Sequence, residues 1–143
     1  MMFSQDHIPE MGYIEQQCFS VPWSFDMLKS ELENPFAKYF CAVDTAVNNS
    51  VLGYIGLHII LDEGYITNIA VRPDKQRLGI ARALLKYLFD LYGSTLSFIT
   101  LEVRESNCAA RSLYSTFGFA EKGRRKLYYD KPREDALIMT KYL

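Results

Sequence analysis

The segment from Tyr65 to Tyr92 constrains the fold of this chain more than any other. It begins with a strand-like run, Tyr65 to Val71, and ends with a helix whose apolar residues form a single stripe. That stripe consists of Ala81, Leu84, Leu85, Leu88 and Tyr92. Between strand and helix stands the turn Gln76-Arg77-Leu78-Gly79-Ile80-Ala81. A strand, a turn and an amphipathic helix in this order are typical of a domain in which helices cover a sheet.

The rest of the chain predicts further helices and strands, with no linker long enough to divide it. Helices are expected over about 8–18, from the N-cap Ser24 to the residue before Asn34-Pro35, and over 109–117, with Gly93 and Gly118 as helix ends. Strands are expected over 39–43, 51–60, 65–71, 98–104, 119–129 and 136–142. Asp62-Glu63-Gly64 reads as a turn. The pattern indicates a single mixed-sheet α/β domain over 1–143.

Composition narrows the class of protein. Apolar residues make up 49% of the 143 residues and charged residues 23%, which favours a packed core over disorder. The formal net charge of -1 disfavours a protein dedicated to binding nucleic acid. The longest nearly apolar run, Val51 to Leu61, is too short to span a bilayer, and the first residues do not resemble a signal peptide. We therefore expect a cytoplasmic protein with no membrane partner.

The cysteines and histidines do not form a metal-binding pattern. The chain has 3 Cys and 2 His, far apart and without a C-x-x-C pair, so no metal is expected. Cys18, Cys41 and Cys108 are expected to be free thiols, and none has a neighbouring histidine that would indicate a nucleophile.

The turn before the helix at 81–92 has the features of an anion site. A helix start offers several N–H groups without intrahelical partners, and the small Gly79 and Ala81 let an anion approach them closely. The turn contains neither a Walker loop nor a Rossmann fingerprint. Residues 72–86 hold five basic side chains against Asp74, a local charge of +4, which leaves -5 for the rest of the chain. This points to a polyphosphate cofactor, although an ordinary helix start has the same spacing.

Three side chains further along are candidates for chemistry. Glu102 shares one face of its strand with Phe98, Thr100 and Arg104, and a carboxylate in such a position can serve as a general base or be a solvated strand residue. Tyr114 carries a phenol that could protonate a thiolate, but it also fits the apolar stripe of the helix at 109–117. Asn107 is placed to cap that helix.

The turn and its strand resemble a known family. Ile69-Ala70-Val71-Arg72-Pro73 followed by Gln76-x-x-Gly79-x-Ala81 is similar to the acetyl-CoA motif of the GCN5-related N-acetyltransferases (GNAT). The resemblance implies a GNAT-like α/β (α+β) fold: a central mixed, mostly antiparallel sheet of about six or seven strands flanked by about four helices. It implies acetyl-CoA as co-substrate, held by Ile69, Ala70, Val71, Gln76, Arg77, Leu78, Gly79, Ile80, Ala81 and Asn107.

Further segments resemble one subfamily, the bacterial ribosomal-protein alanine N-acetyltransferases. They are Pro22-Trp23-Ser24, residues 65–71, Leu101-Glu102-Val103-Arg104, Ser106-Asn107, Leu113-Tyr114 with Gly118-Phe119, and Tyr128-Tyr129 with Glu134-Asp135-Ala136. The resemblance covers the chain from about Ile14 to its last residue.

This resemblance implies transfer of acetyl to the N-terminal alanine of a small-subunit ribosomal protein. It assigns Glu102 as general base, acting directly or through water, and Tyr114 as the acid that protonates coenzyme A. Glu63 is a rival base, and Trp23, Tyr128 and Tyr129 are candidates for a peptide groove. The acceptor could instead be a lysine, a polyamine or a small-molecule amine, or the domain could bind acetyl-CoA without turnover.

Overall fold

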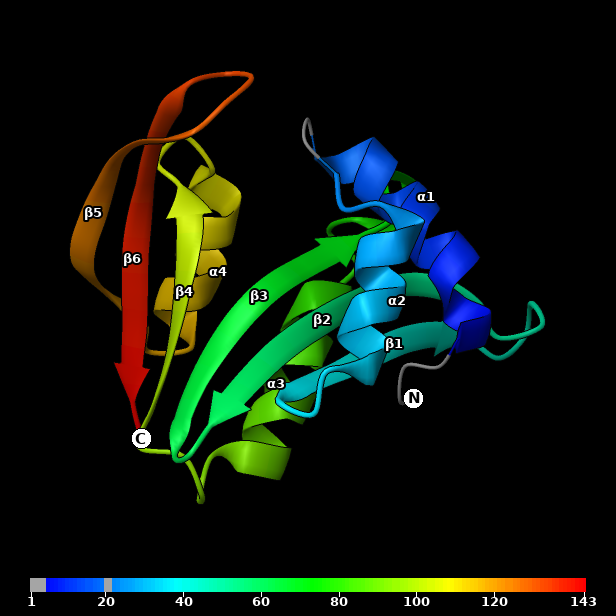
Figure 1. Ribbon diagram of the computed structural model, residues 1–143, viewed down its shortest axis with the longest axis horizontal. Coiled ribbons are helices and arrows are strands. Elements are labelled where there is room, and N and C mark those ends of the chain that lie inside the picture. Colours follow the sequence, from blue (N-terminus) through cyan, green and yellow to red (C-terminus); the bar gives the residue numbers. More distant parts are fainter. Residues whose placement is uncertain (1–4, 20–21) are drawn as a thin grey trace.

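The computed structural model describes residues 5–19 and 22–143 (Figure 1). Within them, six strands form one sheet in the order β1-β2-β3-β4-β6-β5. The strands are β1 (Ala37–Asp44), β2 (Ser50–Ile60), β3 (Glu63–Val71), β4 (Phe98–Arg104), β5 (Ala120–Tyr129) and β6 (Glu134–Tyr142). The α-helices are α1 (Ile8–Cys18), α2 (Phe25–Glu33), α3 (Ile80–Tyr92) and α4 (Cys108–Thr116). β3 and β4 are parallel and the other neighbours antiparallel, which confirms the predicted mixed sheet.

The helix ends follow local chemistry that the sequence displays. The Ser24 side chain accepts a hydrogen bond from the backbone N–H of Met27 at 3.2 Å, as expected of an N-cap. α2 then ends at Glu33, before Asn34-Pro35. Gly93 caps α3 through a hydrogen bond from its N–H to the Phe89 carbonyl, although its φ of -62° is not left-handed. The predicted helix ends are therefore confirmed to within one residue.

One predicted turn is wrong. Glu63 and Gly64 do not form a turn, because they pair with Ile60 and Ile59 as the first residues of β3. The loop between β2 and β3 is only two residues long, Leu61-Asp62. Leu61 takes a positive φ of 56° there, which a two-residue hairpin loop demands and which the sequence does not announce.

The sheet has a separate apolar core on each face. On one face, α3 and α4 pack against the strands through residues that include Leu85, Leu88 and Tyr114. On the other face, α1 and α2 pack through residues that include Met11, Ile14 and Leu28. Figure 1 shows α1 and α2 over β1, β2 and β3, with α3 behind them. The face that carries α1 and α2 leaves β4, β5 and β6 uncovered.

The sheet parts between its two parallel strands. β3 and β4 pair only from Glu63 with Phe98 to Ile66 with Leu101, and beyond this point they diverge, as Figure 1 shows. β4 stays paired with β6 along its whole length. β3 follows β2 and bulges at Thr67, since Gly56 pairs with Asn68 while Leu57 pairs with Ile66. A cleft therefore opens at the carboxyl ends of the two central strands.

Candidate active site

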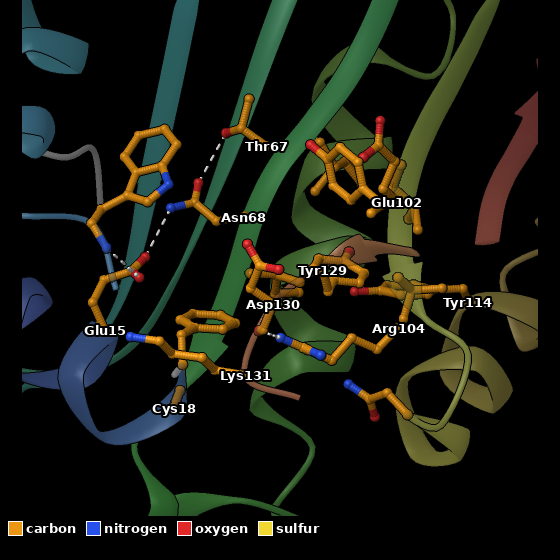
Figure 2. A pocket seen from close by; sticks show the side chains of 18 of the residues that line it. Glu15, Cys18, Thr67, Asn68, Glu102, Arg104, Tyr114, Tyr129, Asp130 and Lys131 are labelled. Carbon is orange, nitrogen blue, oxygen red and sulfur yellow. Dashed lines mark hydrogen bonds between the residues drawn. The ribbon is translucent and has the colours of Figure 1, made fainter. Parts of the chain in front are cut away.

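The cleft where β3 and β4 part has a volume of about 880 Å³ (Figure 2). Its lining comes from segments that are far apart in the sequence. They are the end of α1 and the residues before α2, β3 from Tyr65 to Ile69, β4 from Leu101 to Arg104, Asn107 and Tyr114, and the loop from Tyr128 to Pro132. Glu102, Tyr114, Asn107, Trp23, Tyr128, Tyr129 and Ile69 all belong to this lining. The structure thus brings together in one cleft seven of the sixteen candidate residues that the sequence analysis singled out.

Glu102 lies on β4 just past the last pair with β3. Its neighbours Leu101 and Val103 are buried on the opposite face, which confirms the predicted alternation. The carboxylate is 9% exposed, and its Oε1 accepts a hydrogen bond from the Tyr65 hydroxyl at 2.8 Å and forms an ion pair with Nε of Arg125 at 3.2 Å. This is a mostly buried carboxylate held at the wall of a cleft, which is what a general base requires.

Arg104 follows Glu102 on the same face of β4 but does not contact that carboxylate. Its guanidinium donates to the carbonyls of Asp130 and Pro132 and to Oε1 of Glu134. It also lies 4.4 Å from the ring centroid of Tyr129. Arg104 therefore fixes the loop between β5 and β6 at the edge of the cleft.

Tyr114 reaches the cleft from α4, on the opposite face of the sheet. The residue is 6% exposed, and its ring packs edge-on against Phe119 at 5.8 Å. Burial raises the pKa of its phenol well above the ordinary value, so the group keeps its proton at neutral pH. Tyr114 is thus a core residue whose protonated phenol also lines the cleft, so the two interpretations of its position are compatible.

The turn between β3 and α3 lies beyond the cleft lining, where β3 ends. Gly79 has a φ of 84° and caps α3, and Arg77 also has a positive φ, 64°. The first helical hydrogen bond runs from the Ala83 N–H to the Gly79 carbonyl, so the amides of Ile80, Ala81 and Arg82 precede the helical ladder. Such a helix start fits an anion.

The basic residues at this turn are unevenly neutralised. Arg72 pairs with Asp74 at 2.8 Å, and Lys86 pairs with Asp90 at 2.9 Å. Lys75, Arg77 and Arg82 make no ion pair with any other residue that the structure describes. These three cations are therefore the basic residues of the turn that no carboxylate of the described residues neutralises.

The other expected cofactor residues lie between the cleft and the turn. Ile69 lines the cleft, and Ala70 and Val71 continue β3 toward the turn without a partner on β4. Gln76 donates from Nε2 to the Val71 carbonyl at 3.2 Å and so ties the turn to the strand. Oδ1 of Asn107 caps α4 by accepting from the Ala110 N–H at 3.2 Å. The cap uses Oδ1 and not the amide N–H groups, so capping and a cofactor contact need not compete.

The candidates for a peptide groove lie in the cleft, but the rival base does not. Trp23, Tyr128 and Tyr129 line the cleft, whereas Glu63 is exposed at the first position of β3, where β3 and β4 are still paired. Glu63 therefore lies outside the cleft lining, two residues before Tyr65, the first residue of β3 that lines it. Burial, together with the neighbouring Glu102 carboxylate, raises the pKa of Tyr129 to about 12.

Glu15, a carboxylate that the sequence analysis did not select, connects several of the segments around the wall of the cleft that carries Trp23. It is 1% exposed and accepts hydrogen bonds from the backbone N–H of Trp23 at 3.2 Å, from Nδ2 of Asn68 at 3.1 Å and from the hydroxyl of Tyr54. Figure 2 shows its contacts with Asn68 and with the backbone before α2. Glu15 thus links α1, the segment before α2 and strands β2 and β3.

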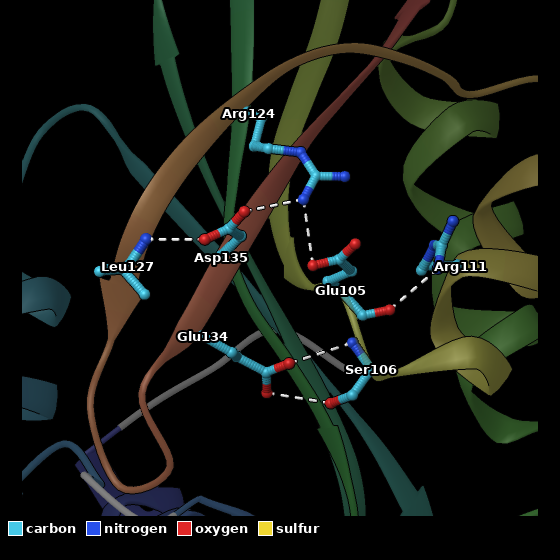
Figure 3. A network of polar contacts seen from close by, with 7 residues as sticks. All are labelled: Glu105, Ser106, Arg111, Arg124, Leu127, Glu134 and Asp135. Carbon is cyan, nitrogen blue, oxygen red and sulfur yellow. Dashed lines mark hydrogen bonds and ion pairs between the residues drawn. The ribbon is translucent and has the colours of Figure 1, made fainter.

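A polar network fixes the β5–β6 hairpin that carries Tyr128 and Tyr129 (Figure 3). Arg124 bridges Glu105 at 3.0 Å and Asp135 at 2.7 Å. Asp135 also accepts from the Leu127 N–H at 2.9 Å, at a bulge where the pairing jumps from Arg125 to Tyr129. The bulge directs Arg125 and Tyr128 toward Glu102.

All three cysteines are free, and Cys18, at the cleft, donates from Sγ to the Val71 carbonyl at 3.2 Å. Burial raises the pKa of Cys18. Over residues 5–19 and 22–143, no cluster of His, Cys, Asp and Glu is arranged to hold a metal ion. No helix in these two ranges has both the length and the apolar character needed to cross a membrane.

Comparison with known proteins identifies the class of this fold and site. The sequence profile of the acetyltransferase (GNAT) family matches residues 8–119. The chain superimposes on the crystal structure of the ribosomal-protein-S18-alanine N-acetyltransferase from Escherichia coli with a TM-score of 0.89 and 35% identity, covering 98% of this chain and 90% of the other. The chain belongs to the acetyltransferase (GNAT) family and is an acyltransferase.

Two curated relatives are similar over nearly their whole length. The ribosomal protein bS18-alanine N-acetyltransferase of Haemophilus influenzae is 41% identical over 134 residues, which cover 91% of this chain and 88% of that protein. The protein of the same name from Escherichia coli K12 is 37% identical over 136 residues, which cover 93% and 89% respectively. The similarity therefore extends over most of this chain and most of each relative.

Proposed function

We propose that this protein transfers acetyl from acetyl-CoA to the N-terminal α-amine of a ribosomal protein whose first residue is alanine. The similarity to the Haemophilus influenzae and Escherichia coli enzymes supports the acceptor, because both are named for alanine acetylation of ribosomal protein bS18. The observation that carries the mechanism is that the Glu102 carboxylate and the Tyr114 phenol line one cleft where β3 and β4 part.

The cofactor side of the cleft fits acetyl-CoA, which supplies the activated acetyl thioester. The amides at the start of α3 and the cations Arg77 and Arg82 suit its pyrophosphate. The edge of β3 that β4 leaves unpaired, over Ile69 to Val71, suits its amide-bearing arm. The amide nitrogen of Asn107 would donate to the same arm.

The reaction we infer is direct attack of the amine on the thioester carbonyl. Glu102 takes a proton from the amine, directly or through water, while backbone N–H groups of β3 near Ile69 polarise the carbonyl. The carbon–sulfur bond then breaks, and Tyr114 gives its proton to the departing thiolate. An α-amine suits a single carboxylate base, since with a pKa near 8 it is about one-tenth neutral at pH 7, whereas a lysine is neutral in less than about one part in a thousand.

The test uses two peptides and the purified protein. One peptide carries a free N-terminal alanine followed by the first residues of ribosomal protein bS18. The other has the same residues with a blocked N-terminus and an internal lysine. We expect thiol release and a mass gain of one acetyl group only with the free alanine. Equal rates on both peptides would overturn the assignment of the N-terminal amine as the acceptor. No thiol release with either peptide would favour a non-catalytic acetyl-CoA-binding domain.

A cellular measurement tests the physiological acceptor. Mass spectrometry of N-terminal peptides from cells with and without this protein should show the loss of acetylation on one ribosomal protein. Acetylation that is unchanged on every ribosomal protein would contradict the proposal.

A further inference from the structure

Tyr65 belongs to the last pair but one between the two central strands. It pairs with Thr100 in the register of β3 and β4, and only the pair Ile66 with Leu101 follows before the strands part. Its hydroxyl donates to Oε1 of Glu102 at 2.8 Å, across the opening of the cleft. We propose that Tyr65 is a positioning residue that holds Glu102 in the orientation needed to accept a proton, an inference that rests on the proposed function.

The other groups at Glu102 are less able to hold it. Nε of Arg125 binds the same oxygen at 3.2 Å, but the Arg125 side chain is 55% exposed and comes from the edge strand β5. Exposed ion pairs contribute little and are screened by salt. Tyr128, whose hydroxyl lies beside Glu102, is 50% exposed on the same strand. Tyr65 is half-buried on a central strand, so it is the most firmly fixed of the three donors.

The chemistry of Tyr65 suits a donor and not a base. Burial raises the pKa of its phenol, and the adjacent Glu102 carboxylate raises it further. The phenol therefore keeps its proton at neutral pH and cannot take one from the amine. A hydrogen bond donated to a carboxylate favours the ionised form, which is the form that accepts a proton. Tyr65 thus acts on the reaction through Glu102.

The experiment removes only the hydroxyl. In Tyr65→Phe we expect kcat with the free-alanine peptide to fall about tenfold, since a hydrogen bond to a charged group is lost. KM for acetyl-CoA should stay within about twofold, and the acid limb of the pH–rate profile should move to higher pH. Tyr142→Phe is the matched control, because Tyr142 is exposed and pairs with Phe98 at the closed end of the sheet. Its kinetics should equal those of the wild type.

A double-mutant cycle decides whether Tyr65 acts through the base. Added to Glu102→Gln, the Tyr65→Phe change should cost no further activity, and the thermal melts of all variants should show that each is folded. A further tenfold loss in the Glu102→Gln background would overturn the inference, as would a folded Tyr65→Phe variant with the rate and pH profile of an active wild type. A wild type that acetylates no amine overturns the proposed function and this inference with it.

Discussion

The two sides of the cleft are built in different ways. The side proposed to hold acetyl-CoA comes, apart from Asn107, from one continuous stretch, Ile69 to Ala81, and offers mainly backbone groups at the end of β3 and the start of α3. The acceptor side consists of side chains from separate segments, with Trp23 before α2, Tyr65 on β3, Glu102 on β4 and Tyr128 on β5. The first site depends on backbone conformation and the second on the identity and packing of individual side chains. Substitutions on the acceptor side should therefore change mainly kcat or KM for the peptide. Substitutions on the acetyl-CoA side should change mainly KM for acetyl-CoA.

The largest effect should come from removing the base on the acceptor side. We expect Glu102→Gln to lower kcat by about 100-fold to 10,000-fold, because an amide cannot accept the proton that the carboxylate takes. The Kd for acetyl-CoA should stay within about twofold, since Glu102 lies away from the turn before α3. Steady-state thiol release and calorimetric titration measure the two quantities.

Tyr114→Phe is the companion variant and removes the proposed acid without removing the ring. We expect a smaller fall in kcat, because water can protonate a thiolate slowly. Full turnover in both Glu102→Gln and Tyr114→Phe would contradict the assignment of either group.

The next largest effect should be on the free energy of unfolding. It should come from Glu15, the carboxylate that connects the segments on the acceptor side of the cleft. Glu15→Leu leaves three donors around a buried site without an acceptor, the N–H of Trp23, the amide of Asn68 and the hydroxyl of Tyr54. We expect a loss of about 3 kcal/mol in the free energy of unfolding. Urea denaturation measures it, with Glu33→Leu as the control because Glu33 is exposed on α2.

The same variant separates the two sides of the cleft. With Trp23 released from its anchor, KM for the peptide should rise more than the Kd for acetyl-CoA. A Glu15→Leu protein with an unchanged urea midpoint would mean that the three donors find other partners.

The sequence predicts the contiguous parts of this molecule far better than the contacts between distant parts. The Ser24 cap, the stripe of α3 and the turn at Gly79 each depend on residues close in the chain, and each is visible as a pattern. Glu15 was missed although a signal existed: it lies four residues after Met11 and three before Cys18, inside the apolar stripe of α1, where a carboxylate needs partners.

Other contacts left no such signal. The hydrogen bond from Tyr65 to Glu102 depends on the register of two parallel strands that are joined through α3. The ion pair of Arg125 with Glu102 depends on the β5 bulge, which a side chain of β6 stabilises. Long-range register and bulges are set by the packed sheet, so periodicity within one strand cannot disclose them.

On the side proposed to hold acetyl-CoA, a change in backbone conformation should raise KM for acetyl-CoA and leave kcat nearly unchanged. Gly79 has a φ of 84°, and nothing lies within 4 Å of the position that a Cβ would occupy. Gly79→Ala therefore introduces no clash but strains the backbone by about 1 kcal/mol. We expect KM for acetyl-CoA to rise about fivefold with kcat nearly unchanged. Gly79→Asn is the control, since asparagine tolerates positive φ and should lose less affinity. An equal loss in both variants would mean that the added side chain, and not the strain, disturbs the turn.

The smallest effect should come from the carboxylates that hold the β5–β6 hairpin. The hydrogen bond from the Leu127 N–H, followed by that from Arg124, lowers the pKa of Asp135. Arg104, followed by Ser106, lowers the pKa of Glu134. A pKa that is lower in the folded state than in the unfolded state adds stability above the unfolded value, about 4 for both residue types, and this stability is lost as the pH falls through the folded value.

The melting temperature should accordingly fall as the pH is lowered from about 4 toward 2. That fall should be shallower in Asp135→Asn and Glu134→Gln, because an amide does not titrate. The pairs are partly exposed, so added salt should reduce the difference. If the melting temperature had the same pH dependence in the wild type and in both variants, neither carboxylate would stabilise the hairpin through its charge. In that case the position of Tyr128 beside Glu102 would depend on the backbone of the bulge, and the acceptor side would resemble the cofactor side more closely than these contacts indicate.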